Sequence, residues 1–131
     1  MDQLPGFTGT AEEWPCSYAG TLPGDVTGAM TGDSNLFFWI YPAEDADAPV
    51  TIWLNGGPGA SSTFANFLFN SPLRIAETTD GTTSTYSMYT STETWTKKTT
   101  MIYIDQPVGT GFSWSPSGTD SYLTNMDEAS E

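Results

Sequence analysis

Histidine is absent from this 131-residue sequence, and cysteine occurs only once, at Cys16. Without histidine, the chain lacks the commonest general base near neutral pH and the commonest transition-metal ligand. By itself it therefore supplies neither a Ser-His-Asp triad nor a histidine-ligated zinc site, and nothing in the sequence indicates a metal or another cofactor. A single cysteine forms no internal disulfide, which leaves a buried thiol and a bridge to another chain as the two interpretations of Cys16.

Basic side chains are also scarce. Arg74, Lys97 and Lys98 stand against 16 acidic residues, which gives a formal net charge of −13. A nucleic-acid-binding protein needs clustered lysine and arginine to release counterions, so nucleic acid is excluded as a partner. An anionic membrane surface would repel the chain, and no run of residues approaches the roughly 18 apolar positions of a membrane span. We therefore expect no membrane partner.

The sequence contains enough apolar residues to form a core. Hydrophobic residues make up 37% of the chain and aromatic residues 14%, whereas disordered tails have few aromatic residues and many charges. The length corresponds to one small domain or a piece of a larger one. The first residues have neither the basic region nor the apolar core of a secretory signal. This start is compatible with a cytosolic chain, with a chain from which a signal was removed, and with a chain that begins inside a longer gene product.

Four β-strands are predicted after an irregular, acidic lead-in at residues 1–14. Residues 17–22 and 35–41 are expected to form an antiparallel pair. Residues 50–54 and 101–104 are nearly continuous apolar runs, typical of strands covered on both faces in the parallel sheet of an α/β protein. The expected fold class is therefore α/β.

A short helix and a long polar segment are predicted between the two apolar strands. Ser61 or Ser62 is suited to cap a helix that continues through Phe69 and ends before Pro72. Residues 78–100 are dominated by threonine and serine, but their regularly placed aromatic residues favour an ordered surface excursion over a low-complexity linker.

The most informative segment is Asn-Gly-Gly-Pro-Gly at residues 55–59, between a predicted strand and the predicted helix. Glycines let the backbone turn sharply and approach a bound group, and the amides around a helix start point outward. Such a loop is suited to hold a developing oxyanion, and α/β-hydrolases use a glycine-rich loop between the third strand and the first helix in this way. Because most glycine-rich turns are only turns, this pattern by itself is a weak indication.

Two motifs in this sequence resemble the hallmark segments of the serine carboxypeptidase family. The first is WLNGGPGASS at residues 53–62, and the second is DQPVGTGFS at residues 105–113. Trp95 matches the aromatic residue that precedes the second motif. The resemblance runs from about Tyr18 to Tyr122, and both motifs stand in the family's order and at its separation.

The resemblance implies that residues 1–131 are the N-terminal part of a single α/β-hydrolase domain, in which an antiparallel hairpin leads into a mixed, mainly parallel sheet. This part is expected to be incomplete, because two doubly covered strands need helices on both faces and the sequence provides one short helix. Residues 127–131 are typical of the acidic first turn of a further helix. Secretory, vacuolar or extracellular residence is also implied.

The same resemblance implies roles for three residues of the glycine-rich loop. Gly57 would donate its amide to the oxyanion, and Asn55 with Gly56 would bind the terminal carboxylate of a peptide substrate. The family's nucleophilic serine, in a G-x-S-x-G elbow, and its aspartate and histidine all follow the part covered here. Ser61 and Ser113 approach that pattern, but both segments lack the closing glycine. We therefore expect the chain to be inactive by itself, with the rest of the domain or a second chain as its partner.

Four positions depart from the family pattern. Ala60 stands where the family usually has cysteine, Ala65 and Ser71 where it has glycine, and Phe69 where a glutamate helps to hold the substrate carboxylate. An apolar ring cannot share a proton with a carboxylate, so peptide termini would bind differently or not at all. Three functions remain open: a carboxypeptidase that acts through an acyl-enzyme, an inactive relative that serves as an acidic binding or structural subunit, and a carboxypeptidase-like acyltransferase.

Overall fold

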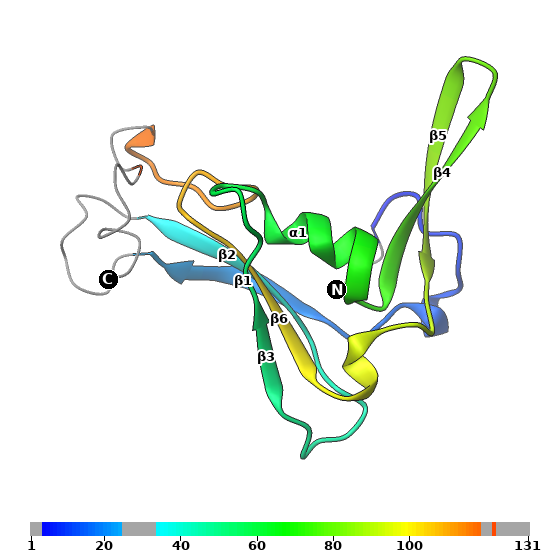
Figure 1. Ribbon diagram of the computed structural model, residues 1–131, viewed down its shortest axis with the longest axis horizontal. Helices are drawn as coiled ribbons and strands as arrows, with labels where there is room; N and C mark the ends of the chain where they lie inside the picture. The colour runs from blue at the N-terminus through cyan, green and yellow to red at the C-terminus, as the bar shows by residue number, and fades with distance from the viewer. Residues whose placement is uncertain (1–3, 25–33, 119–121, 123–131) are drawn as a thin grey trace.

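The computed structural model describes residues 4–24, 34–118 and 122, and Figure 1 shows how its elements are arranged. No helix among these residues is long and apolar enough to cross a membrane. Residues 127–131, where a further helix is expected to begin, lie outside the described residues. In chain order the elements are the 3-10 helix η1 (Ala11–Glu13), β1 (Tyr18–Pro23), β2 (Asn35–Tyr41), β3 (Val50–Trp53), α1 (Ser62–Ala65), the π-helical turn η2 (Asn66–Asn70), β4 (Leu73–Asp80), β5 (Thr83–Thr90), the 3-10 helix η3 (Trp95–Lys97) and β6 (Thr100–Asp105).

Four strands form one mixed sheet in the order β1-β2-β6-β3. β1 and β2 pair antiparallel, as predicted, with Tyr18 opposite Ile40, and β2 also pairs antiparallel with β6. β3 and β6 pair parallel, as predicted from their apolar runs, with Ile52 opposite Ile102. One of the three pairings within this four-stranded sheet is parallel, so its described strands do not form the mainly parallel sheet that was expected.

The helical segment after β3 forms where the sequence predicts it. The Ser61 hydroxyl oxygen accepts a hydrogen bond from Thr63 N at 3.1 Å and thereby caps α1. The alternative cap, Ser62, is buried and binds the loop that precedes the helix. η2 continues the helical segment to Asn70, one residue beyond the predicted end, and the backbone becomes extended at the next residue.

The polar segment after the helix is ordered, as predicted, but it contributes to a hairpin that the sequence pattern did not predict. β4 and β5 pair antiparallel from Leu73 opposite Thr90 to Asp80 opposite Thr83. The two-residue loop begins at Gly81, whose φ of +64° suits the first position of a type II′ turn. Figure 1 shows the hairpin projecting from the body of the molecule.

The core lies on the face of the sheet that carries the helical segment. Alternate positions of β2 and β6 point to this face, and one residue each from α1 and β4 packs onto them. Full burial of a large apolar side chain contributes about 1.5–3 kcal/mol, so this face holds the described elements together. The buried members of the cluster are Trp39, Tyr41, Ala65, Leu73, Met101 and Tyr103.

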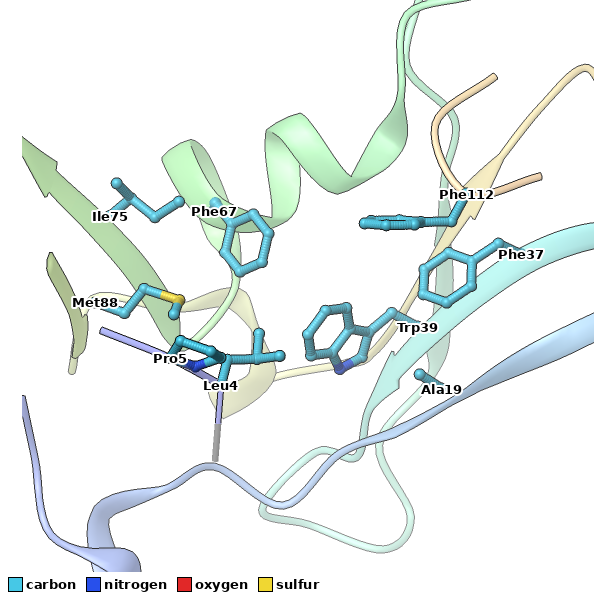
Figure 2. Close-up of a pocket in the computed structure, with 9 residues that line it drawn as sticks. All are labelled: Leu4, Pro5, Ala19, Phe37, Trp39, Phe67, Ile75, Met88 and Phe112. Atoms are coloured by element: carbon cyan, nitrogen blue, oxygen red, sulfur yellow. The ribbon is translucent and has the colours of Figure 1, made fainter. Parts of the chain in front are cut away.

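An apolar cavity of about 480 Å³ adjoins this core. Figure 2 shows Phe67 of the helical segment above Trp39 of β2, and the two rings meet edge to face at 5.8 Å. Met88 of β5 lies beside Phe67 in the same view. The lining residues carry no charge and include no residue of segment 55–59, so the cavity belongs to the core side of the molecule rather than to the glycine-rich loop.

The lead-in is irregular, as predicted, with one short 3-10 helix, and it is bonded to the hairpin. Thr8 N donates to Met88 O at 2.8 Å, and Met88 N donates to Gly6 O at 2.7 Å. Phe7 and Trp14 meet edge to face at 5.0 Å and pack against the core. The lead-in therefore connects β5 to the rest of the described structure.

The opposite face of the sheet is uncovered among the described residues. On β3, Val50 is 62% exposed and Ile52 is 57% exposed. Strand alternation places Ile102 and Ile104 of β6 on this same face. In the part of the chain that the structure describes, the two apolar strands are therefore covered on one face only, which agrees with the expectation that this is an incomplete part of a domain. A contiguous apolar surface of this kind marks an interaction site.

We predict that the purified chain binds the neutral dye Nile red through this open face. Replacing Val50 and Ile52 together by lysine should lower the dye fluorescence by roughly half or more, because charged side chains interrupt the apolar surface. The control replaces two exposed hairpin residues, Thr78 and Thr82, by lysine and should leave the fluorescence unchanged. A chain that stays monomeric and does not enhance the dye would contradict the prediction.

Candidate functional site

Segment 55–59 forms an exposed turn at the carboxyl end of β3. Asn55 N donates to the Ser62 hydroxyl oxygen at 3.0 Å, and Trp53 Nε1 donates to Asn55 Oδ1 at 3.2 Å. Ala60 N donates to Gly56 O at 3.2 Å, which closes the turn. The loop is therefore anchored at one end to β3 and at the other to the start of the helical segment.

Gly56 and Gly57 present their amides to solvent. Both residues are exposed, and within residues 4–24, 34–118 and 122 no group accepts a hydrogen bond from either amide. The φ of Gly57 is +136°, which L side chains rarely adopt, and an added Cβ would lie 3.0 Å from Ala60 N. The three predicted site residues, Asn55, Gly56 and Gly57, thus come together on one loop that offers unused backbone donors.

The carboxylate of Asp105 lies behind this loop. Asp105 is the last residue of β6 and is 1% exposed. Its Oδ1 accepts hydrogen bonds from the Ser61 hydroxyl at 2.7 Å and from Thr63 N at 3.1 Å, and its Oδ2 accepts from the Thr63 hydroxyl at 3.2 Å. Hydrogen bonds to an ionised acceptor are stronger than neutral ones, so Asp105 fixes the start of α1 to the sheet.

The loop after β6 closes on the same carboxylate. Phe112 N donates to Asp105 Oδ2 at 3.1 Å. The Ser113 hydroxyl donates to the backbone oxygen of Asp105 and accepts from Phe37 N at 2.8 Å. Ser113 is 4% exposed, and the Ser61 hydroxyl is hydrogen-bonded to a carboxylate, so both hydroxyls take part in hydrogen bonds of the scaffold.

Gly111 completes the packing around Asp105. Its φ is +57°, and an added Cβ would lie 2.0 Å from Asp105 Oδ2. Neither Asp105 nor Gly111 was predicted from the sequence to have a role of its own. A usable signal was present, because an aspartate that ends an apolar strand and precedes a glycine-rich loop is placed where a buried carboxylate meets backbone amides.

Arg74 is a second residue whose structural role was missed. Its guanidinium is buried and donates to the backbone oxygens of Phe69 at 2.7 Å and Glu93 at 2.9 Å, which ties the end of the helical segment to the residues before η3. Burial lowers the pKa of Arg74, although a guanidinium stays charged at neutral pH. Nearby, burial raises the pKa of Tyr103, whose protonated hydroxyl donates to Asn70 Oδ1 at 2.7 Å.

The four departures from the family pattern fall into a buried group and an exposed group, and Ala60 belongs to the exposed group. Ala65 and Ser71 are fully buried, and the Ser71 hydroxyl donates to Leu73 O at 3.0 Å. Phe69, in contrast, is 58% exposed and lies edge to face with Phe64, itself 55% exposed, at 5.9 Å. The buried replacements take part in the scaffold, whereas the exposed ring faces solvent.

The remaining candidate groups lie outside this site. Lys97 and Lys98 are exposed. Cys16 is also exposed, so the interpretation of a buried thiol is wrong. In the described part of the chain, no group of three or more Cys, Asp or Glu side chains comes together to hold a metal ion.

Comparison with known proteins decides the family. The family model described as serine carboxypeptidase matches residues 15–131. The chain belongs to the serine carboxypeptidase family. It is 43% identical over 114 residues to the probable serine carboxypeptidase CPVL of Homo sapiens, and 43% identical over 111 residues to the vitellogenic carboxypeptidase of Aedes aegypti. These alignments cover 86% and 80% of this chain.

A solved member of the family has a similar fold. The crystal structure of KEX1(delta)P, a prohormone-processing carboxypeptidase from Saccharomyces cerevisiae, matches with a TM-score of 0.61 and 31% identity, over 87% of this chain and 23% of that one. The alignments cover 21% of the human protein and 22% of the mosquito protein. The chain thus spans about a fifth of the length of its curated relatives. Over the matched part it has the fold of the yeast carboxypeptidase.

We predict that Gly111→Ala destabilises the chain by about 3 kcal/mol or more, because the new Cβ displaces the buried Asp105 carboxylate from its donors. Gly118 provides a matched control, since its φ of +59° is nearly the same as that of Gly111 but nothing lies within 4 Å of an added Cβ. Gly118→Ala should cost only about 1–2 kcal/mol, the penalty of a positive φ. Urea denaturation measures both, and equal losses would contradict the assigned contact.

Proposed function

We propose that this chain is the N-terminal part of a serine carboxypeptidase hydrolase domain and supplies its oxyanion-binding amide through Gly57. The observation that carries this proposal is the exposed turn at residues 55–59, whose Gly56 and Gly57 amides have no acceptor among the described residues. An oxyanion forms during attack on a carbonyl carbon and is stabilised by amides already held in place. The family membership and the position of the turn after β3 support the same role.

Asn55 and Gly56 are proposed to bind the terminal carboxylate of a peptide substrate. Asn55 Oδ1 is already occupied by the indole N–H of Trp53 at 3.2 Å. This leaves both N–H groups of the Asn55 side-chain amide for an acceptor, and a carboxylate offers acceptor oxygens only. Together with the exposed Gly56 amide, the loop is suited to an anion but not to a cation.

The proton-transfer residues must come from outside this sequence. The chain has no histidine, and the two serines in near-elbow segments are held by other hydrogen bonds. Further strands of the same domain, or of a second chain, would extend the sheet, and further helices would cover its open face. The same elements would supply the nucleophile, the aspartate and the histidine. The isolated chain should resist labelling by a fluorophosphonate, whereas the completed enzyme should be labelled at a serine.

A carboxypeptidase-like acyltransferase is the second candidate, because of Phe69. The exposed Phe64–Phe69 ring pair offers an apolar contact where a glutamate would assist carboxylate binding. Such a contact suits an apolar acyl group better than a charged peptide terminus. An assembled protein that trims peptides but transfers no acyl group would remove this candidate, and an assembled protein with neither activity would favour an acidic structural subunit.

We predict that Asn55→Asp in the completed enzyme raises KM for a peptide with a free C-terminus by about tenfold or more. The replacement keeps the shape and the acceptor for Trp53, but it sets a negative charge against the substrate carboxylate, and hydrogen bonds to charged groups contribute about 1.5–3 kcal/mol. The matched substrate is the same peptide with a methyl ester terminus, for which KM should change little. Equal effects on the acid and the ester would contradict carboxylate binding by Asn55.

We predict that Gly57→Ala lowers kcat of the completed enzyme by about 10²–10³-fold, the loss measured when one oxyanion donor is removed elsewhere. The added Cβ strains the φ of +136° and presses on Ala60 N, so the amide turns away from the reacting carbonyl. Gly81→Ala, on the hairpin outside the site, is the control, because Gly81 also has a positive φ (+64°) and an added Cβ there meets nothing within 4 Å. Steady-state hydrolysis with a fully retained kcat in Gly57→Ala would dismiss the oxyanion role.

A further inference from the structure

The glycine-rich loop is attached at both ends to the same three residues. Its first residue, Asn55, donates its backbone N–H to the Ser62 hydroxyl at 3.0 Å. Its far end continues through Ala60 directly into Ser61. The position of the whole turn therefore depends on where residues 61–63 are held, and not only on the direction of β3.

Residues 61–63 are in turn held by one side chain. Three of the four hydrogen bonds to the Asp105 carboxylate come from Ser61 and Thr63, and the fourth comes from Phe112 N. Asp105 ends β6, which is an inner strand between β2 and β3, so the carboxylate is fixed to the sheet. A buried acceptor therefore holds residues 61–63, to which both ends of the turn are attached.

We infer that Asp105 is a positioning residue for the reaction, which holds the Gly57 amide at the reacting carbonyl through Ser61 and Thr63. The inference rests on the proposed function of Gly57. Asp105 is buried and touches no substrate, so its effect is on geometry. Catalytic groups lose effect when displaced by a fraction of an ångström, so the expected loss is in kcat rather than in KM.

The test replaces Asp105 in the full-length parent protein. Asp105→Asn keeps the size of the side chain but sets an N–H₂ group against backbone N–H donors, so at least one of the four hydrogen bonds is lost. We expect kcat to fall by about 10-fold to 100-fold with KM changed less than about twofold. Thr63→Val removes only the hydroxyl donor and serves where Asp105→Asn does not fold; we expect a smaller loss of kcat in the same direction.

Thr99→Val is the matched control. The Thr99 hydroxyl makes a partly buried hydrogen bond to Pro49 O at 2.8 Å and another with the Thr51 hydroxyl at 2.6 Å, at the opposite end of the β3–β6 pair. Its replacement should lower the melting temperature and leave kcat unchanged. A merely structural Asp105 would behave in the same way, so kcat per folded molecule separates the two roles.

Amide hydrogen exchange supplies a readout that does not need activity. Asp105→Asn should accelerate exchange at Asn55, Ala60 and Thr63 at least tenfold while leaving the amides of β2 unchanged. Unaltered exchange at these three sites, a global acceleration that includes β2, or a kcat loss matched by Thr99→Val would overturn the inference. A wild-type parent that neither hydrolyses peptides nor reacts with a fluorophosphonate would refute the proposed function, and the exchange pattern would still decide whether Asp105 positions the loop.

Discussion

The described structure depends on one buried charge, the carboxylate of Asp105. Burying an ionised group is costly unless hydrogen bonds replace its hydration, and here four donors do so. β3 and β6 are parallel neighbours, so their carboxyl ends meet at one edge of the sheet and bring both following loops to the same carboxylate. The requirement to satisfy Asp105 therefore fixes the distance between the two loops and, with it, the exposed turn at residues 55–59.

The elements with a strong apolar pattern could be predicted from the sequence, whereas the hairpin could not. β3 and β6 are short apolar runs that end at polar or glycine-rich residues, so their positions could be predicted to within one residue at each end. β5 reads Thr-Ser-Thr-Tyr-Ser-Met-Tyr-Thr, in which a few aromatic or apolar side chains stand among hydroxyl groups. The pairing of β4 with β5 depends on cross-strand contacts and on the turn at Gly81. A largely polar composition gives no apolar pattern from which this pairing could be predicted.

The candidate site was predicted in part for a related reason. Asn55, Gly56 and Gly57 are adjacent in sequence, so a motif was enough to group them. Asp105 lies 42 to 44 residues from Thr63 and Ser61, and its donors are a hydroxyl or a backbone amide that any loop contains. The local pattern, an aspartate at the end of an apolar strand and before a glycine-rich loop, indicates a buried carboxylate, but only the fold determines which distant residues donate to it.

The two kinds of departure from the family pattern have different physical consequences. A serine hydroxyl at position 71 is fully buried and hydrogen-bonded, so it is accommodated by the scaffold and leaves the turn at residues 55–59 in place. Phe64 and Phe69 are instead more than half exposed although they touch each other. Single exposed apolar side chains are ordinary, but a contiguous pair beside a site is favourable only once it is covered. The exposed pair is therefore available for contact with another surface, whereas Ser71 acts within the scaffold.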